Sequence, residues 1–344
     1  MYVSRWDLGF GIEARRISLQ PYTLLQTRLL LNSATSASRW VLPAIFAASL
    51  RLFALAVHAD NVLAIRREKP RCLEEAARTL NKAFSVCATD RFNTAPTSRK
   101  WGSYYMCNLL FRTYFRVRQI NLAGNLIRSL KSVDLPELDQ FPIAHAVTYR
   151  YYMGVLAFYD EQYKRAQDEL TWALQHFPPL TTQTRKHNQA LLLAHLIPIN
   201  LLAGRTPAPA LLGGHPRLRA LFADLIDALG AGRLGDFDAA LAQRQMELIG
   251  KGLYLTLERC RIVCFRNLAR RVFFIRDKTT RLELRDVLTA VHVAGCTDVD
   301  MDEIECMVAN LIDKGFVKGY ISHERLMLVL SPKDAFPALS SVPF

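Results

Sequence analysis

The chain has 344 residues, of which 51% are hydrophobic, and its formal net charge is +13 with an isoelectric point near 9.6. This hydrophobic content excludes a disordered chain, because it is enough to bury a sizeable core. The excess of positive charge favours contact with polyanions or with acidic proteins. Seven scattered cysteines, an odd number without a CxxC pair, indicate a reducing compartment and exclude a disulfide framework.

The N-terminal part lacks the patterns of targeting and membrane segments. Arg5 and Asp7 lie near the start and no apolar core precedes a small-residue cleavage site, so we expect no secretory signal. The stretch 41–57 is the one that suggests a membrane span, but it contains Pro43 and Arg51. It also falls short of the about 20 apolar residues that a span needs. We therefore expect no membrane insertion.

The region before residue 279 shows helical periodicity and almost no strand pattern. Its apolar residues recur at spacings of three and four in segments separated by Pro, Gly, Asn, Ser and Thr clusters. One helix pair follows the spacing of a tetratricopeptide repeat, with small residues where two antiparallel helices touch and a proline after them, namely Gly154, Ala166, Leu170, Ala173 and Pro178. A weaker copy occurs at Gly232, Phe237 and Ala240. The sequence predicts a solenoid of helix pairs.

A run of cations follows the repeats. We interpret the segment as one amphipathic helix whose buried stripe is Leu257, Ile262, Phe265, Leu268 and Val272. Its cations, opposed in this span by the single acid Asp277, are Arg259, Arg261, Arg266, Arg270, Arg271, Arg276 and Lys278. Such a basic face either binds phosphates or only keeps the surface solvated, and the sequence leaves both open.

Residues 299–330 predict a helix followed by two strands. The helix begins at Asp300, suited to capping, and has one apolar face made by Ile304, Met307, Val308, Leu311 and Ile312. Gly315 ends the helix, and β-forming residues follow on both sides of the polar tip 322–325. This order of elements is typical of the end of a winged helix.

The outer positions of this module extend the basic surface. They are Lys314, Lys318, His323 and Arg325. Acidic residues crowd the start of its helix, at Asp302, Glu303 and Glu305, where they repel phosphates. We therefore expect no sequence-specific reading of DNA, and a salt-sensitive contact with RNA or another single strand is the form of binding that remains.

Motifs of catalysis and of metal binding are missing. The chain has no GxxxxGK[ST], GxGxxG, HExxH or GxSxG motif. Cys260 and Cys264 lie one turn apart on an apolar face and are interpreted as core residues. The acids between Asp298 and Glu305 lack the spacing of a calcium loop. We expect a protein that is not an enzyme and holds no metal or cofactor.

Several segments together resemble the PCI domain, a helical repeat capped by a winged helix. They are residues 147–154, 257–272, 309–312, 317–323 and the closing Phe336-Pro337, within a match that runs from about Arg39 to Leu339. The resemblance is to one branch of that family. This branch contains the PCI subunit of transcription-and-export complex 2 and its relative, the twelfth signalosome-type subunit of fungi.

The resemblance implies a non-enzymatic adapter in the nuclear complex that couples transcription to mRNA export. It implies contact with a large scaffold subunit and with RNA through the winged helix, contact with a small acidic DSS/Sem-type protein, and a location in the nucleus and its pores with some in the cytoplasm. The alternative is a signalosome-type or splicing-linked PCI subunit of another assembly. Both use the same surfaces.

The predicted fold is mainly α, with a tetratricopeptide-like array capped by a winged helix. Its parts are a divergent segment 1–38, N-terminal repeats 39–147, a PCI domain 148–331 divided into repeats 148–253 and linking helix plus winged helix 254–331, and a tail 332–344. The candidate nucleic-acid contacts are Arg266, Arg270, Arg271, Lys314, Lys318, His323 and Arg325. The candidate partner contacts are Lys164, Arg165, Arg185, Lys186 and Tyr320.

Overall fold

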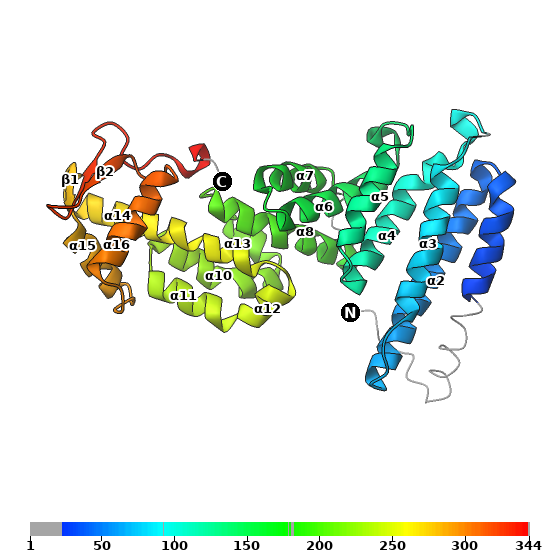
Figure 1. Ribbon diagram of the computed structural model, residues 1–344, viewed down its shortest axis with the longest axis horizontal. Coiled ribbons are helices and arrows are strands. Elements are labelled where there is room, and N and C mark those ends of the chain that lie inside the picture. The colour runs from blue at the N-terminus through cyan, green and yellow to red at the C-terminus, as the bar shows by residue number, and fades with distance from the viewer. Residues whose placement is uncertain (1–22, 92, 178, 180–181, 343–344) are drawn as a thin grey trace. The chain divides into compact units, whose positions relative to one another are not determined.

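The computed structural model describes residues 23–91, 93–177, 179 and 182–342 (Figure 1). The described residues form two compact units, divided between Tyr152 and Met153. The expectations that concern residues 1–22 and Pro178 lie outside the described residues.

The first unit is a series of helices in which each packs against the next. It begins with helical residues 23–33, and α2 contacts α3, α3 contacts α4, and α4 contacts α5. Its α-helices are α2 (Leu42–Ile65), α3 (Cys72–Ala88), α4 (Ser103–Val117), α5 (Asn121–Lys131) and α6 (Ile143–Tyr159), the last of which continues into the second unit. Its short 3-10 turns are η1 (Ala34–Ser36), η2 (Arg39–Val41), η3 (Ala95–Thr97), η4 (Arg99–Gly102) and η5 (Leu138–Gln140).

Helix α2 corrects one expectation. Its 24 residues exceed the predicted apolar stretch, and by length and composition alone residues 39–65 are sufficient to cross a membrane. The prediction that this segment is too short was therefore wrong. The helix nevertheless packs against α3 and α4 and fully buries Ile45, Leu52 and Ala56, as a core helix of a repeat does. The absence of membrane insertion stays a prediction.

The second unit continues the helical array. Its helices up to the winged helix are α7 (Tyr163–Gln175), α8 (Gln183–Leu202), α9 (Pro209–Gly213), α10 (Pro216–Ala231), α11 (Leu234–Gln243), α12 (Gln245–Gly250), α13 (Tyr254–Arg259) and α14 (Arg261–Ile275). The predicted repeat is confirmed in its described residues, because Ala166, Leu170 and Ala173 are fully buried on α7. Gly154 of α6 faces them so closely that a Cβ there would lie 2.6 Å from Cγ of Leu170.

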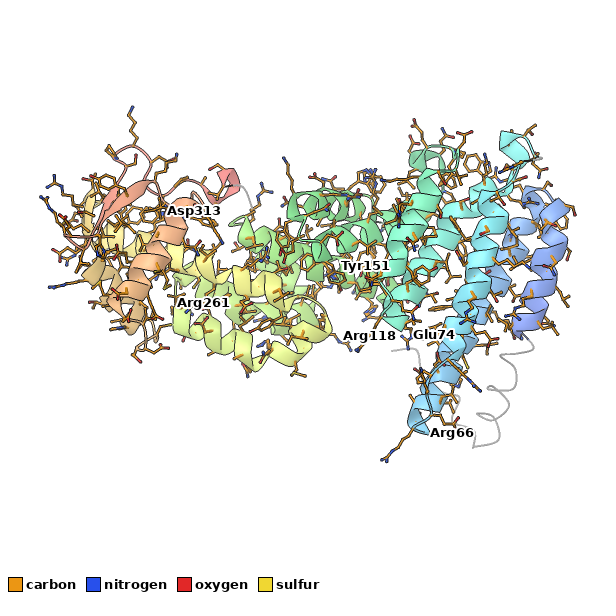
Figure 2. All side chains as sticks on the ribbon, viewed as in Figure 1. Arg66, Glu74, Arg118, Tyr151, Arg261 and Asp313 are labelled. Carbon is orange, nitrogen blue, oxygen red and sulfur yellow. The ribbon has the colours of Figure 1, made fainter. Side chains whose placement is uncertain are left out.

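The predicted basic helix is in fact two helices. α13 ends at Arg259 and α14 begins at Arg261, with Cys260 between them donating its N–H to the carbonyl of Leu257. Apolar spacing does not distinguish one helix from two that meet at a tight turn, so the prediction of a single helix was wrong. Figure 2 shows Arg261 at the start of α14. α14 packs against α10 and α11 of the array and against α15 (Leu284–Val293) of the winged helix.

The winged helix is present as predicted, with one more strand. Its further elements are α16 (Met301–Asp313), β1 (Arg281–Glu283), β2 (Gly319–Ser322) and β3 (Met327–Leu330), and the last turn of the chain is η6 (Leu339–Ser341). The strands form an antiparallel sheet in the order β1-β3-β2, in which Leu282 pairs with Leu328 and Tyr320 pairs with Val329. β1 was not predicted, because it has three residues and Leu282 is its single apolar one.

Local signals account for the shape of this module. The carboxylate of Asp300 accepts the N–H of Glu303 at 2.9 Å while Glu303 caps the N–H of Asp300, which is the predicted N-cap. At the other end Gly315 has a φ of 75°, a left-handed conformation that suits glycine. Of the predicted apolar face, Ile304, Val308 and Leu311 are fully buried, whereas Met307 and Ile312 are only half-buried.

The segment after β3 is not a separate tail. Its backbone pairs with the wing, since Lys318 donates its N–H to Ala335 at 2.9 Å, and Phe336 packs its ring against Phe273 of α14. Further on, Leu339 lies against Gly204 at the end of α8. The predicted tail, as far as residue 342, therefore joins the winged helix to the helical array.

Candidate nucleic-acid and partner interface

Three of the predicted cations are neutralised by acids from other elements. Arg259 lies 2.6 Å from Glu161, and Arg261 binds Asp238 with two nearly parallel hydrogen bonds of 2.9 and 3.0 Å. Arg276 donates to Asp286 of α15 at 2.7 Å. The sequence does not place these acids near the cations, because they are distant along the chain. These ion pairs join elements within the second unit and leave little net charge for a polyanion.

Arg266 corrects a prediction. Its side chain is only 4% exposed, and it donates hydrogen bonds to the backbone carbonyls of Phe336 and Pro337 at 3.2 and 2.7 Å. Burial, followed by the nearby charge of Arg270, lowers its pKa to about 10, so the side chain stays charged at neutral pH. The residue fastens the C-terminal segment to α14. It has no surface to offer to a phosphate, and the prediction of a nucleic-acid contact here was wrong.

The remaining cations of this segment form a free positive surface. Arg270, Arg271 and Lys278, here called the α14 cation face, are exposed, and none of them has a carboxylate partner among the described residues. They surround two apolar side chains that are unusually accessible, Phe274 at 46% and Ile275 at 78%. The guanidinium of Arg270 and the ammonium of Lys278 lie 5.1 and 5.5 Å from the centre of the Phe274 ring.

The wing and the end of α16 hold the other predicted contacts, and all of them are exposed. Lys318 forms an ion pair of 2.8 Å with Asp334, and His323 lies 2.9 Å from the carboxylate oxygens of Glu305. The hydrogen bond to Glu305 raises the pKa of His323. Lys314 and Arg325 have no acidic partner among the described residues. Of the seven predicted nucleic-acid contacts, the ones that are exposed and have no acidic partner among the described residues are therefore Arg270, Arg271, Lys314 and Arg325.

The acidic start of α16 lies where it was expected. Asp302 and Glu303 are exposed in the first turn, and Glu305 pairs with His323 of the wing. A phosphate approaching this end of the helix meets negative charge, although the helix dipole alone favours an anion there. This geometry agrees with the expectation that the helix does not read DNA bases.

The predicted partner contacts do not lie together. Lys164 and Arg165 are in the first turn of α7, and Arg185 and Lys186 are in the first turn of α8. The two helices are antiparallel, because Gln167 near the start of α7 donates to Asn200 near the end of α8 at 2.8 Å. The two pairs of cations therefore lie at opposite ends of this helix pair. Tyr320 is in the winged helix, where it is 63% exposed on the edge strand β2.

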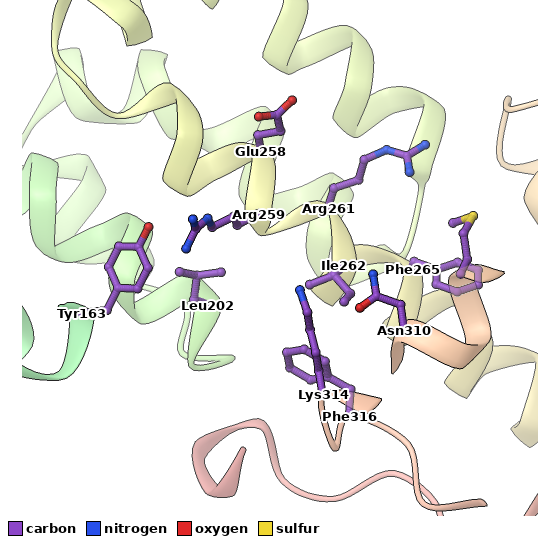
Figure 3. Close-up of a pocket in the computed structure, with 11 residues that line it drawn as sticks. Tyr163, Leu202, Glu258, Arg259, Arg261, Ile262, Phe265, Asn310, Lys314 and Phe316 are labelled. Atoms are coloured by element: carbon purple, nitrogen blue, oxygen red, sulfur yellow. The ribbon is translucent and has the colours of Figure 1, made fainter. Parts of the chain in front are cut away.

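A pocket of about 640 Å³ opens between the array and the winged helix (Figure 3). The sequence did not indicate it, because its walls come from four separate stretches of the chain, at 163, 202, 258–265 and 307–316. Asn310 of α16 and Lys314 just after it line the pocket opposite Arg261 and Ile262, while Tyr163 and Leu202 close the side formed by the array. The half-burial of Met307 and Ile262 follows from their position in this pocket. Its charge is close to balanced, since Arg259 and Arg261 both have acidic partners.

Comparisons with known proteins identify the family. The PCI domain matches residues 241–332. A protein CSN12 homolog of Mycosarcoma maydis is 40% identical over 333 residues, covering 90% of this chain and 72% of that protein. PCI domain-containing protein 2 of Danio rerio is 34% identical over 322 residues, covering 93% of this chain and 78% of that protein. The homolog of PCI domain-containing protein 2 in Drosophila melanogaster is 37% identical over 268 residues, covering 78% of this chain and 66% of that protein. The chain therefore belongs to the PCI-domain family, in the branch of the CSN12 homologs and PCI domain-containing protein 2.

Proposed function

We propose that this protein is a non-enzymatic adapter subunit of the nuclear complex that couples transcription to mRNA export. It joins a large scaffold subunit and contacts RNA, weakly and without sequence preference, through the winged helix and the end of α14. The observation that carries the RNA contact is the α14 cation face. Arg261 and Arg276 on the same helix are neutralised by carboxylates, whereas Arg270, Arg271 and Lys278 are left with an uncompensated positive charge.

The partner contacts follow from the two other exposed features. The edge strand β2 presents Tyr320, a residue type that is enriched at protein interfaces, and we assign it to the scaffold subunit. The cations at the two ends of the α7 and α8 pair are assigned to a small, acidic, extended protein, because an extended chain can reach both ends. The nucleus, with its pores, is the proposed location, and a fraction is cytoplasmic.

A second candidate function is favoured by the names of the fungal relatives. The CSN12 homologs are named for a signalosome subunit, so this chain is alternatively a signalosome-type or splicing-linked subunit. Affinity purification of the tagged protein from nuclear extract, followed by mass spectrometry, separates the two. Recovery of a large export scaffold supports the first function. Recovery of signalosome or splicing subunits in its place refutes it.

The RNA contact is tested by charge reversal on α14. We expect Arg270→Glu combined with Arg271→Glu to abolish binding of a single-stranded RNA in filter-binding or anisotropy measurements. Arg270→Gln combined with Arg271→Gln, which removes the two charges without reversing them, should lower the slope of log affinity against log salt by about 1.4. Lys318 is left unchanged because its loss would also release Asp334.

A matched control lies on α7. Lys164→Glu combined with Arg165→Glu changes the net charge by the same amount at two exposed positions of the helical array. This control should bind RNA like the wild type. Equal losses in the two variants would show that only the overall charge matters, and unchanged binding in the α14 variant would refute the assignment of the RNA site.

A further inference from the structure

The end of α14 combines charge with an exposed aromatic ring. Phe274 remains 46% exposed even though Arg270 and Lys278 both contact its ring, and Ile275 beside it is 78% exposed. In the core of the second unit, by contrast, aromatic rings such as Phe222, Phe237 and Phe265 are at most 1% exposed. An accessible ring between two cations matches what single-stranded nucleic acids require, a face for a base and positive charge for the phosphates on each side of it.

The backbone that places Lys278 at the ring is unfavourable. Asp277 and Lys278 follow the helix with φ values of 50° and 58°, the left-handed region that glycine adopts without strain. Their N–H groups close the helix end by donating to the carbonyls of Phe274 and Phe273. A glycine at position 278 would close the helix equally well but would carry no cation to the ring. The strained turn therefore has the effect of holding a positive charge against Phe274.

We propose that Phe274 is a base-stacking residue and that Arg270, Phe274 and Lys278 together form a binding site for one or two nucleotides of single-stranded RNA. A base takes the place of one of the cations against the ring, and both cations contact the flanking phosphates. This inference rests on the proposed RNA contact and adds a preference for single strands over duplexes. A duplex has its bases stacked inside, so it meets the cations but not the ring.

A single strand fits this surface better than a protein does. The surface has two exposed apolar side chains, whereas a stable protein interface buries about 800 Å² on each partner. A protein would also need to supply carboxylates for Arg270, Arg271 and Lys278, since each would otherwise be buried without a counter-charge. A strand of RNA supplies regularly spaced phosphates together with flat bases.

The test replaces the ring and keeps its apolar character. We expect Phe274→Leu to weaken binding of a single-stranded oligonucleotide about tenfold, the lower part of the range for one stacked base, while duplex RNA binds as before. The salt dependence of binding should not change, because no charge is removed. Trp40→Leu, which removes an exposed aromatic side chain in the first unit, is the control and should leave both affinities unchanged.

A second variant guards against an effect of misfolding. Lys278→Gly removes one cation and relieves the left-handed backbone, so it should melt no lower than the wild type and still weaken single-strand binding.

Equal affinity of wild type and Phe274→Leu, or an equal loss for single strands and duplexes, would overturn the stacking role. If charge reversal at Arg270 and Arg271 still abolishes binding in that case, the proposed function stands and only this inference falls. Loss of scaffold co-purification in Phe274→Leu without loss of RNA affinity would identify the surface as a protein interface and also overturn the inference.

Discussion

Gly154 offers the sharpest test of how the helices of the second unit pack. It lies on α6 where a Cβ would be 2.6 Å from Cγ and 2.8 Å from Cδ2 of Leu170 on α7. Both distances are far below van der Waals contact, and Leu170 is fully buried and cannot move out into solvent. The two helices therefore approach this closely only because position 154 has no side chain.

We expect Gly154→Ala to destabilise the protein although alanine is the better helix former. Overpacking by one methyl group costs roughly 1–3 kcal/mol, and the gain in helix propensity is about 1 kcal/mol, so the net loss is at most about 2 kcal/mol. Gly230 near the end of α10 is the control, because a Cβ there has nothing within 4 Å. Gly230→Ala should be neutral or stabilising by up to about 1 kcal/mol.

Urea unfolding followed by circular dichroism measures both variants, and both glycines lie in the second unit. A double-mutant cycle with Leu170→Ala identifies the cause of the loss. In the Leu170→Ala background the added methyl group fills space, so Gly154→Ala should become neutral or stabilising. If Gly154→Ala stabilises the otherwise unchanged protein as Gly230→Ala does, or if the cycle shows no coupling, the close packing of α6 on α7 is refuted.

Three further predictions concern the winged helix and its partners. Leu311→Asp should unfold the winged helix and abolish co-purification with the scaffold, whereas Ile312→Asp, at a half-buried position, should melt closer to the wild type. Equal melting temperatures of the two variants would contradict this prediction. Glu305 raises the pKa of His323, so their ion pair should be intact below about pH 6.5 and be lost as the pH rises through the raised pKa. NMR titration of His323 should show that the increase in its pKa disappears in Glu305→Gln. Saturation with the small acidic protein should raise the melting temperature. At a free concentration of one hundred times Kd, binding adds about 2.7 kcal/mol to the free energy of unfolding, and an unchanged melting temperature would exclude this partner.

The winged helix was predictable because its signals are local. The cap at Asp300, the apolar face of α16 and the turn at Gly315 all lie within sixteen residues, and each element is specified by neighbours in the sequence. The tetratricopeptide spacing was informative for the same reason, since Gly154 and Leu170 belong to one helical hairpin. β1 was missed because a strand of three residues carries too little pattern to be distinguished from a loop.

The candidate site was predicted less well, because contacts between distant residues decide it. Arg266 has the spacing of an exposed cation, and only the carbonyls of Phe336 and Pro337, about seventy positions later, make it a core residue. The charge of Arg261 is compensated by Asp238 on α11. Neither partner can be assigned from local periodicity. What the sequence did indicate correctly is the exposure of Arg270 and Arg271, whose role in RNA binding stays a prediction.

The burial of Arg266 has a consequence for how the basic surface is presented. Its lowered pKa means that keeping the charge inside the protein costs stability, and the hydrogen bonds to two carbonyls offset that cost. The buried guanidinium of Arg266 favours the one position of the C-terminal segment in which the carbonyls of Phe336 and Pro337 accept its hydrogen bonds. In any other position its Nη2 group would lose these acceptors. That segment pairs with Lys318 at the wing and reaches Gly204 in the array. The C-terminal segment thereby contacts the wing, α14 and the end of α8, so it connects the proposed RNA contact with the helical array.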